Sequence, residues 1–79
     1  MLLVRYFAGA RAAAGRTEEK VTAGTLDDLV GMLVSAHGDG LARVLGAASF
    51  LVDGVAWRDR TAALPADATV DVLPPFAGG

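Results

Sequence analysis

The first apolar segment of the chain is typical of a β-strand. Residues 1–7 combine aliphatic and aromatic side chains that suit a pleated surface, and Gly9 ends the run. Successive side chains of a strand point to opposite faces. The apolar residues predicted to share the inner face are Leu2, Val4 and Tyr6. Arg5 marks the other face as solvated, so we expect Phe7, which shares that face, to be an exposed aromatic residue.

Two short elements are predicted before the main helix. Residues 10–14 are rich in Ala and predict a single helical turn, which Gly15 closes. Residues 17–22 alternate weakly and carry Glu18, Glu19 and Lys20, as expected for an exposed strand that pairs with the first one. Together these segments predict a hairpin with a long connection.

The clearest helical pattern begins after Thr25. Thr25 is a good N-cap, and Asp27 and Asp28 fall in the first turn, where backbone N–H groups and the helix dipole favour negative charge. Apolar side chains then recur with a helical period and form one stripe, which comprises Leu26, Leu29, Val30, Leu33 and Val34. His37 and Gly38 supply a polar last turn and a left-handed stop.

The second half of the chain predicts a short helical turn and three strands. Leu and Val among Gly and Ala indicate the turn at residues 38–46. Residues 49–52 and 55–57 flank Asp53-Gly54, the strongest short-range hairpin signal in the chain. After a turn at residues 64–69, a last strand is predicted at residues 70–73. Its inward side chains are Val70 and Val72, and its outward side chains are Asp71 and Leu73.

The order of these elements predicts an α+β fold with one main helix across a mixed sheet of about five strands. The helix connection is expected to be right-handed and to cover one face of the sheet, which places the last strand beside the first in a ubiquitin-like β-grasp arrangement. No repeat or linker interrupts the 79 residues, so we expect a single domain over residues 1–79. Pro74-Pro75 ends the last strand because proline has no backbone N–H to donate.

Composition and charge exclude several classes of function. There is no Cys, so a disulfide framework, a thiolate nucleophile and a Cys-based zinc site are ruled out. One His makes a histidine metal motif or a catalytic dyad improbable. A formal charge of −2 with a single Lys argues against nucleic acid as a partner. No stretch approaches the roughly 20 apolar residues of a membrane span. We therefore expect a cytoplasmic protein with little catalytic equipment of its own.

The candidate chemistry lies in residues 74–79, which we expect to form a flexible tail. The two prolines favour an extended exit from the sheet, and the last residues lack branched side chains. Such a tail can enter a narrow tunnel in another protein. The residues expected to occupy that tunnel are Pro74, Pro75, Phe76, Ala77 and Gly78. The α-carboxylate of Gly79 is ionised at neutral pH and is a poor electrophile, so a partner must activate it, as an acyl-adenylate made with ATP.

The sequence Tyr-Phe-Ala-Gly-Ala-Arg at residues 6–11 and the ending Leu-Pro-Pro-Phe-Ala-Gly-Gly at residues 73–79 carry a family resemblance. Over essentially its whole length, the chain resembles the sulfur-carrier subunit of molybdopterin synthase, the MoaD family of ubiquitin-like proteins. Two features depart from that family: Asp67-Ala68-Thr69 lacks the usual turn glycine, and Phe76-Ala77 replaces aliphatic or hydroxylic residues. The second departure bears on the choice of partner, and neither touches the chemistry.

The resemblance implies a carrier cycle in which catalysis belongs to other proteins. An E1-like enzyme of the MoeB type would adenylate Gly79 with ATP, and a sulfurtransferase would supply the sulfur that makes a thiocarboxylate. The large synthase subunit, of the MoaE type, would then bind the tail and use that sulfur to build the dithiolene of molybdopterin. The chain itself would bind no cofactor and no metal.

The resemblance also implies a set of partner-binding residues. Phe7, Trp57 and Leu73 match positions of an apolar patch that both partners use, and Arg11 matches an arginine that pairs with an acidic partner surface. Strand alternation independently supports exposure of Phe7 and Leu73. Trp57 shares the parity of Val55 and fits the core equally well, and a solvated loop position is the alternative for Arg11.

Three other functions stay open at this point. The chain could carry sulfur for thiamine or cysteine synthesis, since the physics of the tail is the same. It could be a ubiquitin-like modifier that is joined to lysines of target proteins. It could also be a plain interaction module in which Gly78-Gly79 has no role.

Overall fold

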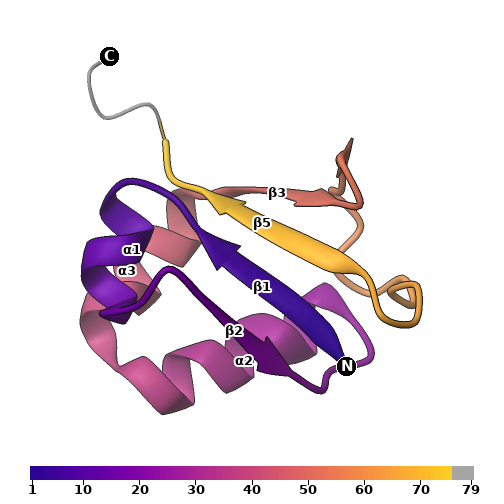
Figure 1. Ribbon diagram of the computed structural model, residues 1–79, viewed down its shortest axis with the longest axis horizontal. Coiled ribbons are helices and arrows are strands. Elements are labelled where there is room, and N and C mark those ends of the chain that lie inside the picture. Colours follow the sequence, from indigo (N-terminus) through magenta and orange to yellow (C-terminus); the bar gives the residue numbers. More distant parts are fainter. Residues whose placement is uncertain (76–79) are drawn as a thin grey trace.

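Five strands form one mixed sheet in the computed structural model, which describes residues 1–75. The strands are β1 (Leu2–Tyr6), β2 (Glu18–Val21), β3 (Ser49–Val52), β4 (Val55–Ala56) and β5 (Thr69–Leu73). Their order is β2-β1-β5-β3-β4, in which β1 and β5 run parallel and the other neighbours run antiparallel (Figure 1). The predicted fold class, including the last strand beside the first, is confirmed.

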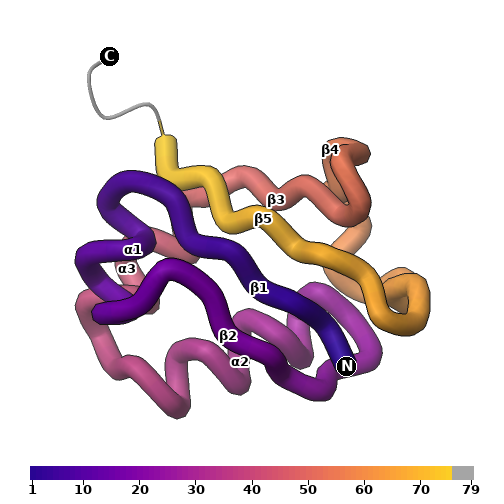
Figure 2. The backbone as a smooth tube through the Cα atoms, viewed as in Figure 1, coloured from indigo at the N-terminus to yellow at the C-terminus, as the bar shows by residue number. Residues whose placement is uncertain are grey.

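Three helices supply the other layer of the fold. They are α1 (Gly9–Ala14), α2 (Leu26–His37) and α3 (Asp39–Ala47). Figure 2 shows the backbone of α2 and α3 running along one side of the sheet. The α3 helix has nine residues, whereas the sequence predicted only a short turn there. Leu41 and Leu45 are both buried and lie one helical turn apart, so tertiary packing extends the helix despite its glycines.

The main helix begins and ends as the sequence predicted. The Thr25 hydroxyl accepts a hydrogen bond of 3.1 Å from the backbone N–H of Asp28. Gly38 ends the helix with a φ of 85°, a conformation that favours glycine. The buried residues of its apolar stripe are Leu26, Leu29 and Leu33. Within residues 1–75, no helix combines the length and apolar character needed to cross a bilayer.

The core lies between the helices and the inner face of the sheet. The inward residues of β1 and β5 that are buried there are Leu2, Val4, Tyr6, Val70 and Val72. The tight turn between β3 and β4 has Asp53 at φ 49° and Gly54 at φ 82°, as an Asp-Gly hairpin requires. The Asp53 carboxylate also accepts a hydrogen bond of 2.9 Å from the Thr69 N–H, which joins this turn to the start of β5.

Glu19 links three elements at one edge of the core. Its Oε2 atom accepts a hydrogen bond of 2.5 Å from the Tyr6 hydroxyl of β1 and lies 2.5 Å from His37 Nε2 at the end of α2. The Arg16 guanidinium lies 3.6 Å from the other carboxylate oxygen. Burial alone would raise the pKa of Glu19, but the hydrogen bonds from Tyr6 and His37 outweigh it and hold the pKa below its usual value.

We expect the Glu19→Gln variant to lose part of the acid sensitivity of the fold. Because folding lowers the pKa of Glu19, its ionised form stabilises the native state above the unfolded value of 4.5, and this contribution is lost as the pH falls. At neutral pH the free energy of unfolding of the variant should be about 1–3 kcal/mol lower than that of the parent protein. When the free energy of unfolding is measured in urea between about pH 7 and pH 3, it should fall less steeply with decreasing pH in the variant than in the parent protein. Glu18 is an exposed neighbour, so Glu18→Gln is the control variant. An equal loss of stability in the Glu18 and Glu19 variants would contradict the assigned role of Glu19.

Candidate functional site

The candidate site lies where β1 and β5 end together. Because these strands are parallel, their carboxyl ends meet at one edge of the sheet, as Figure 1 shows. The Phe7 N–H donates to the Val72 carbonyl at 3.3 Å, which continues the pairing of the two strands by one step. This register places Phe7 beside Leu73 on the face opposite the helices. Pro74 and Pro75 follow directly, so the chain leaves the sheet next to these two side chains.

Three half-buried apolar side chains define an outer patch on this face: Phe7, Leu51 and Leu73. The pairs Ser49–Leu73 and Leu51–Asp71 make Leu51 a diagonal neighbour of Leu73 across β3 and β5. Among residues 1–75, the helices pack on the other face and leave this patch to solvent. Clustered apolar side chains on an otherwise polar surface are typical of a protein-binding site.

An ion pair crosses the middle of the outer face beside this patch. Arg5 donates two hydrogen bonds to Asp71, from Nε to Oδ1 at 2.6 Å and from Nη2 to Oδ2 at 2.9 Å. These bonds raise the pKa of the Arg5 guanidinium and favour its charged form. Arg5 also lies over the Phe7 ring, with Cζ 5.8 Å from its centroid.

Two expectations about this face need correction. Asp71 points to the outer face as predicted, but only 7% of it is exposed, because Arg5 and the neighbouring side chains enclose the carboxylate. Phe7 is half-buried instead of fully exposed, since Arg5 covers part of its ring. The outer face is therefore a structured surface of apolar side chains around one satisfied ion pair.

We expect the two halves of this ion pair to differ in their effect on stability. Arg5→Met leaves the enclosed Asp71 carboxylate without its partner, which is costly, whereas Asp71→Asn leaves a half-exposed Arg5 that water can solvate. Thermal unfolding at pH 7 should therefore show a larger loss for Arg5→Met than for Asp71→Asn. The opposite order would show that the carboxylate is better solvated than its 10% side-chain exposure implies.

Arg11 lies near the same edge, in α1. Its Nε atom donates a long hydrogen bond of 3.4 Å to the Tyr6 carbonyl, and the side chain is exposed. Within residues 1–75 no carboxylate forms an ion pair with it. The charge therefore remains available to an acidic partner surface, and that role stays a prediction.

Trp57 does not join the outer patch, which corrects the expected grouping with Phe7 and Leu73. The Trp57 N–H donates to the Phe50 carbonyl at 2.9 Å, so these residues sit opposite each other and share a face. Phe50 is in the core, and Trp57 packs against that core from the edge of the sheet. The parity that Trp57 shares with Val55 already allowed this placement.

Four predicted tail residues lie outside the described part of the chain: Phe76, Ala77, Gly78 and Gly79. Their roles in the tunnel and in thiocarboxylate formation stay predictions. Pro74 is half-buried and Pro75 exposed at the point where the tail begins. Leu51 and the pairing of Arg5 with Asp71 were not predicted from the sequence. Strand parity could have found Leu51, because residues 49–52 alternate and Phe50 is the inward one.

Solved structures with this fold include two kinds of small protein. Small archaeal modifier protein 1 from Haloferax volcanii matches with a TM-score of 0.82 and 27% identity over 99% of this chain and 98% of that one. The complex of subunits 1 and 2 of molybdopterin-converting factor from Helicobacter pylori matches with a TM-score of 0.74 and 22% identity over 99% and 97%. Both agree with the ubiquitin-like resemblance seen in the sequence.

A third solved structure is more similar in sequence. The Haloferax volcanii HVO 2177 protein is 30% identical, with a TM-score of 0.76 over 99% of this chain and 85% of that one. No family model and no curated protein sequence matches the chain. The comparisons thus establish the fold and a group of small proteins that share it.

Proposed function

We propose that this chain, a ubiquitin-like β-grasp protein, is a sulfur carrier that works through the carboxylate of Gly79. The observation that carries the proposal is the common end of β1 and β5. There the outer patch lies beside the point where Pro74-Pro75 leaves the sheet, and Arg11 contacts the end of β1. A partner that grips this surface is positioned to receive the residues that follow it.

The chemistry starts from an unreactive group. A carboxylate does not exchange oxygen for sulfur at neutral pH, because its negative charge repels a nucleophile and oxide is a poor leaving group. Attack of the Gly79 carboxylate on the α-phosphate of ATP gives an acyl-adenylate and releases pyrophosphate. The terminal sulfur of a persulfide on a sulfurtransferase then displaces AMP to give an acyl disulfide. A thiol cleaves its S–S bond, forming a new disulfide with the sulfurtransferase and releasing the thiocarboxylate. An E1-like enzyme of the MoeB type would hold ATP, so this chain needs no nucleotide site of its own.

The tail composition suits transfer inside a partner. Glycine lacks Cβ, so a Gly-Gly ending is able to adopt backbone angles closed to other residues and to enter a narrow channel of a partner. The reacting atom is thereby separated from the folded body, whose outer patch supplies binding energy. This division of labour explains why a chain with one His and no Cys can take part in the reaction.

The most specific form of the proposal is sulfur donation for molybdopterin. The fold shared with subunit 1 of the Helicobacter pylori complex supports it, because there subunit 1 is bound to subunit 2. The ending Pro-Pro-x-x-Gly-Gly and residues 6–11 support it from the sequence. In this form the second partner is a large synthase subunit of the MoaE type. Carriers for thiamine or cysteine synthesis would use the same tail chemistry.

A second candidate function is protein modification. Small archaeal modifier protein 1 is the neighbour at 27% identity, and its name describes a modifier. In this case the acyl-adenylate, or a thioester made from it, would be attacked by a lysine amine of another protein to give an isopeptide bond. The first activation step is common to both functions, and they differ in the nucleophile that follows.

The chain recovered from its host cells separates these functions. Purification under denaturing conditions, followed by intact mass measurement, should show a gain equal to the replacement of one oxygen by one sulfur. A modifier instead appears in adducts in which Gly79 is joined to a lysine of another protein. Restoration of molybdopterin synthesis in a bacterium that lacks its small synthase subunit tests the specific pathway. If cells that express the parent chain contain neither the thiocarboxylate nor such an adduct, the proposal is contradicted.

A further inference from the structure

A pocket opens between the start of α2 and the edge made by β3 and β4. Its volume is about 260 Å³, below the roughly 300–1,000 Å³ typical of small-molecule sites, so it suits one large apolar side chain. Leu26, Phe50 and Trp57 supply its apolar lining. The charged residues that line it are both cationic, Arg58 and Arg60. The pocket is therefore apolar inside and has two guanidinium groups at its margin.

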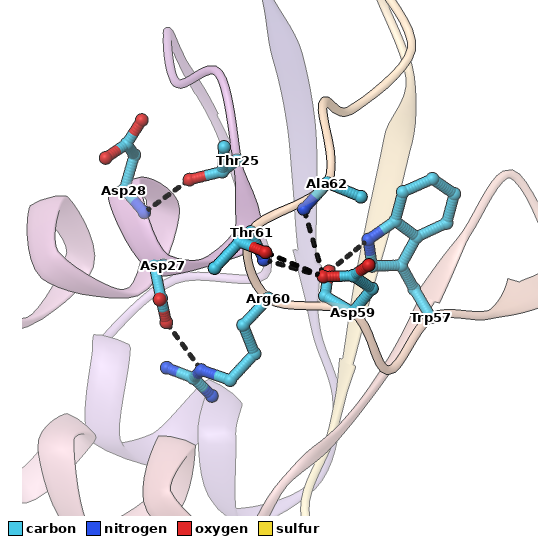
Figure 3. A network of polar contacts seen from close by, with 8 residues as sticks. All are labelled: Thr25, Asp27, Asp28, Trp57, Asp59, Arg60, Thr61 and Ala62. Carbon is cyan, nitrogen blue, oxygen red and sulfur yellow. Dashed lines mark hydrogen bonds and ion pairs between the residues drawn. The ribbon is translucent and has the colours of Figure 1, made fainter.

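Trp57 is held in place by the loop that follows it, as Figure 3 shows. Its indole N–H donates to the Asp59 carbonyl at 2.9 Å. The Asp59 carboxylate accepts hydrogen bonds from the N–H and hydroxyl of Thr61 and from the Ala62 N–H, at 3.0–3.1 Å. These bonds hold the pKa of Asp59 below its usual value, so the carboxylate keeps its charge and the loop keeps its shape. An aromatic side chain fixed before binding loses little entropy when a partner arrives.

Arg60 is also preorganised, by contact with the first turn of α2. Its Nε atom donates to Asp27 Oδ1 at 2.6 Å (Figure 3). Its carbonyl accepts from the Asp27 N–H at 3.0 Å. Its two terminal guanidinium nitrogens have no hydrogen-bond partner among residues 1–75. Arg58 is exposed and forms no ion pair within the same residues. Two arginines thus offer free N–H groups beside an apolar hollow.

We propose that this pocket docks an acidic peptide segment of a partner protein, with one apolar side chain in the hollow and the following carboxylates on Arg58 and Arg60. Trp and Arg are the residues most enriched where binding energy concentrates. Arg58 has no ion pair within residues 1–75 and the terminal nitrogens of Arg60 are free, so both can donate to carboxylates of a bound segment. The inference goes beyond the sulfur-carrier proposal, because the pocket shares only Leu51 with the outer patch and its anchors, Trp57, Arg58 and Arg60, lie outside that patch.

A peptide titration of the full ¹⁵N-labelled chain tests the proposal. The probe is the capped hexapeptide Gly-Ser-Leu-Asp-Asp-Ser. Two control peptides each carry one change: Asn-Asn replaces Asp-Asp in the first, and Ser replaces Leu in the second. We expect saturable shifts of the Trp57 indole N–H and of the Ser49 and Arg58 amides. Each control peptide should bind about five- to tenfold more weakly. Absence of saturable shifts, or equal binding of the neutral peptide, would overturn the proposal.

A pair of charge reversals locates the site. Arg58→Glu should lower the affinity for the acidic peptide by about fivefold or more, because it replaces attraction by repulsion. Arg43→Glu changes an exposed arginine on α3, outside the pocket lining, and should leave binding unchanged. Equal binding to both variants, shifts that centre on Phe7 and Leu73, or tighter binding of a single-stranded oligonucleotide at Arg58 would overturn the proposal. Neither ATP nor sulfur enters this assay, so its outcome is independent of the chemistry at Gly79.

Discussion

Removal of Gly79 should abolish thiocarboxylate formation while the fold stays intact. A chain that ends at Gly78 still has a carboxylate, but that group falls short of the activating site by one residue, roughly 3.3–3.6 Å in an extended chain. A displacement of even 1 Å at a reacting centre lowers a rate by about 100-fold, so a loss of at least that size is expected. The rate is measured as thiocarboxylate formed with ATP, the E1-like enzyme and a sulfur source.

Two further variants distinguish the effect of the length of the tail from the effect of its width. Gly79→Ala keeps the length of the tail and adds a Cβ, so it should also react poorly if the channel is narrow. Ala77→Gly keeps the length and removes a methyl group, and it serves as the control that should remain active. The thermal unfolding midpoint should be the same in all variants, because the sheet and helices are complete within residues 1–75. Thiocarboxylate formation at the full rate by the chain that lacks Gly79 would contradict the carrier mechanism.

The second large effect is expected from acidic substitutions in the outer patch. Leu73→Asp places a charge at the root of the tail, in the centre of the surface that a partner must desolvate. A hot-spot residue of this kind contributes about 2 kcal/mol or more, so affinity for the large synthase subunit should fall by about 30-fold or more. Calorimetry with the purified subunit measures this change, and Phe7→Asp should behave similarly.

A matched variant on the other side of the molecule controls for nonspecific effects of the charge. Met32 is an exposed apolar residue of α2, with 44% of its surface accessible. The change Met32→Asp introduces the same charge away from the outer patch and should leave affinity unchanged. If it weakens binding as much as Leu73→Asp does, the partner uses the helical side and the assigned interface is wrong.

Local sequence patterns determined most of the fold because each element carries its own signals. The hydroxyl of Thr25, the two following aspartates and the apolar stripe specify α2 without help from distant residues. Asp53-Gly54 likewise specifies a tight turn, since both residues adopt positive φ. In α3 the signals conflict: Gly40 and Gly46 weaken helix propensity, and only burial of Leu41 and Leu45 in the core completes the helix.

The candidate site was harder to predict because it depends on register between distant strands. Arg5 and Asp71 are 66 positions apart, and their pairing follows from the alignment of β1 with β5, which no local pattern encodes. The placement of Trp57 similarly depends on its position opposite Phe50 after β4 has ended. Side-chain parity predicted the faces of Phe7 and Leu73 correctly, but the coverage of Phe7 by Arg5 required the assembled sheet.

The central claim is that the Gly79 carboxylate is the working group of this protein, and intact-protein mass spectrometry tests it most directly. The purified chain is incubated with ATP, a cognate E1-like enzyme and a sulfur donor, and its mass is compared with that of the untreated chain. The account predicts a gain equal to one sulfur in place of one oxygen, located at Gly79 and absent when ATP is withheld. An unchanged mass with an enzyme that thiocarboxylates its own carrier under the same conditions would contradict it.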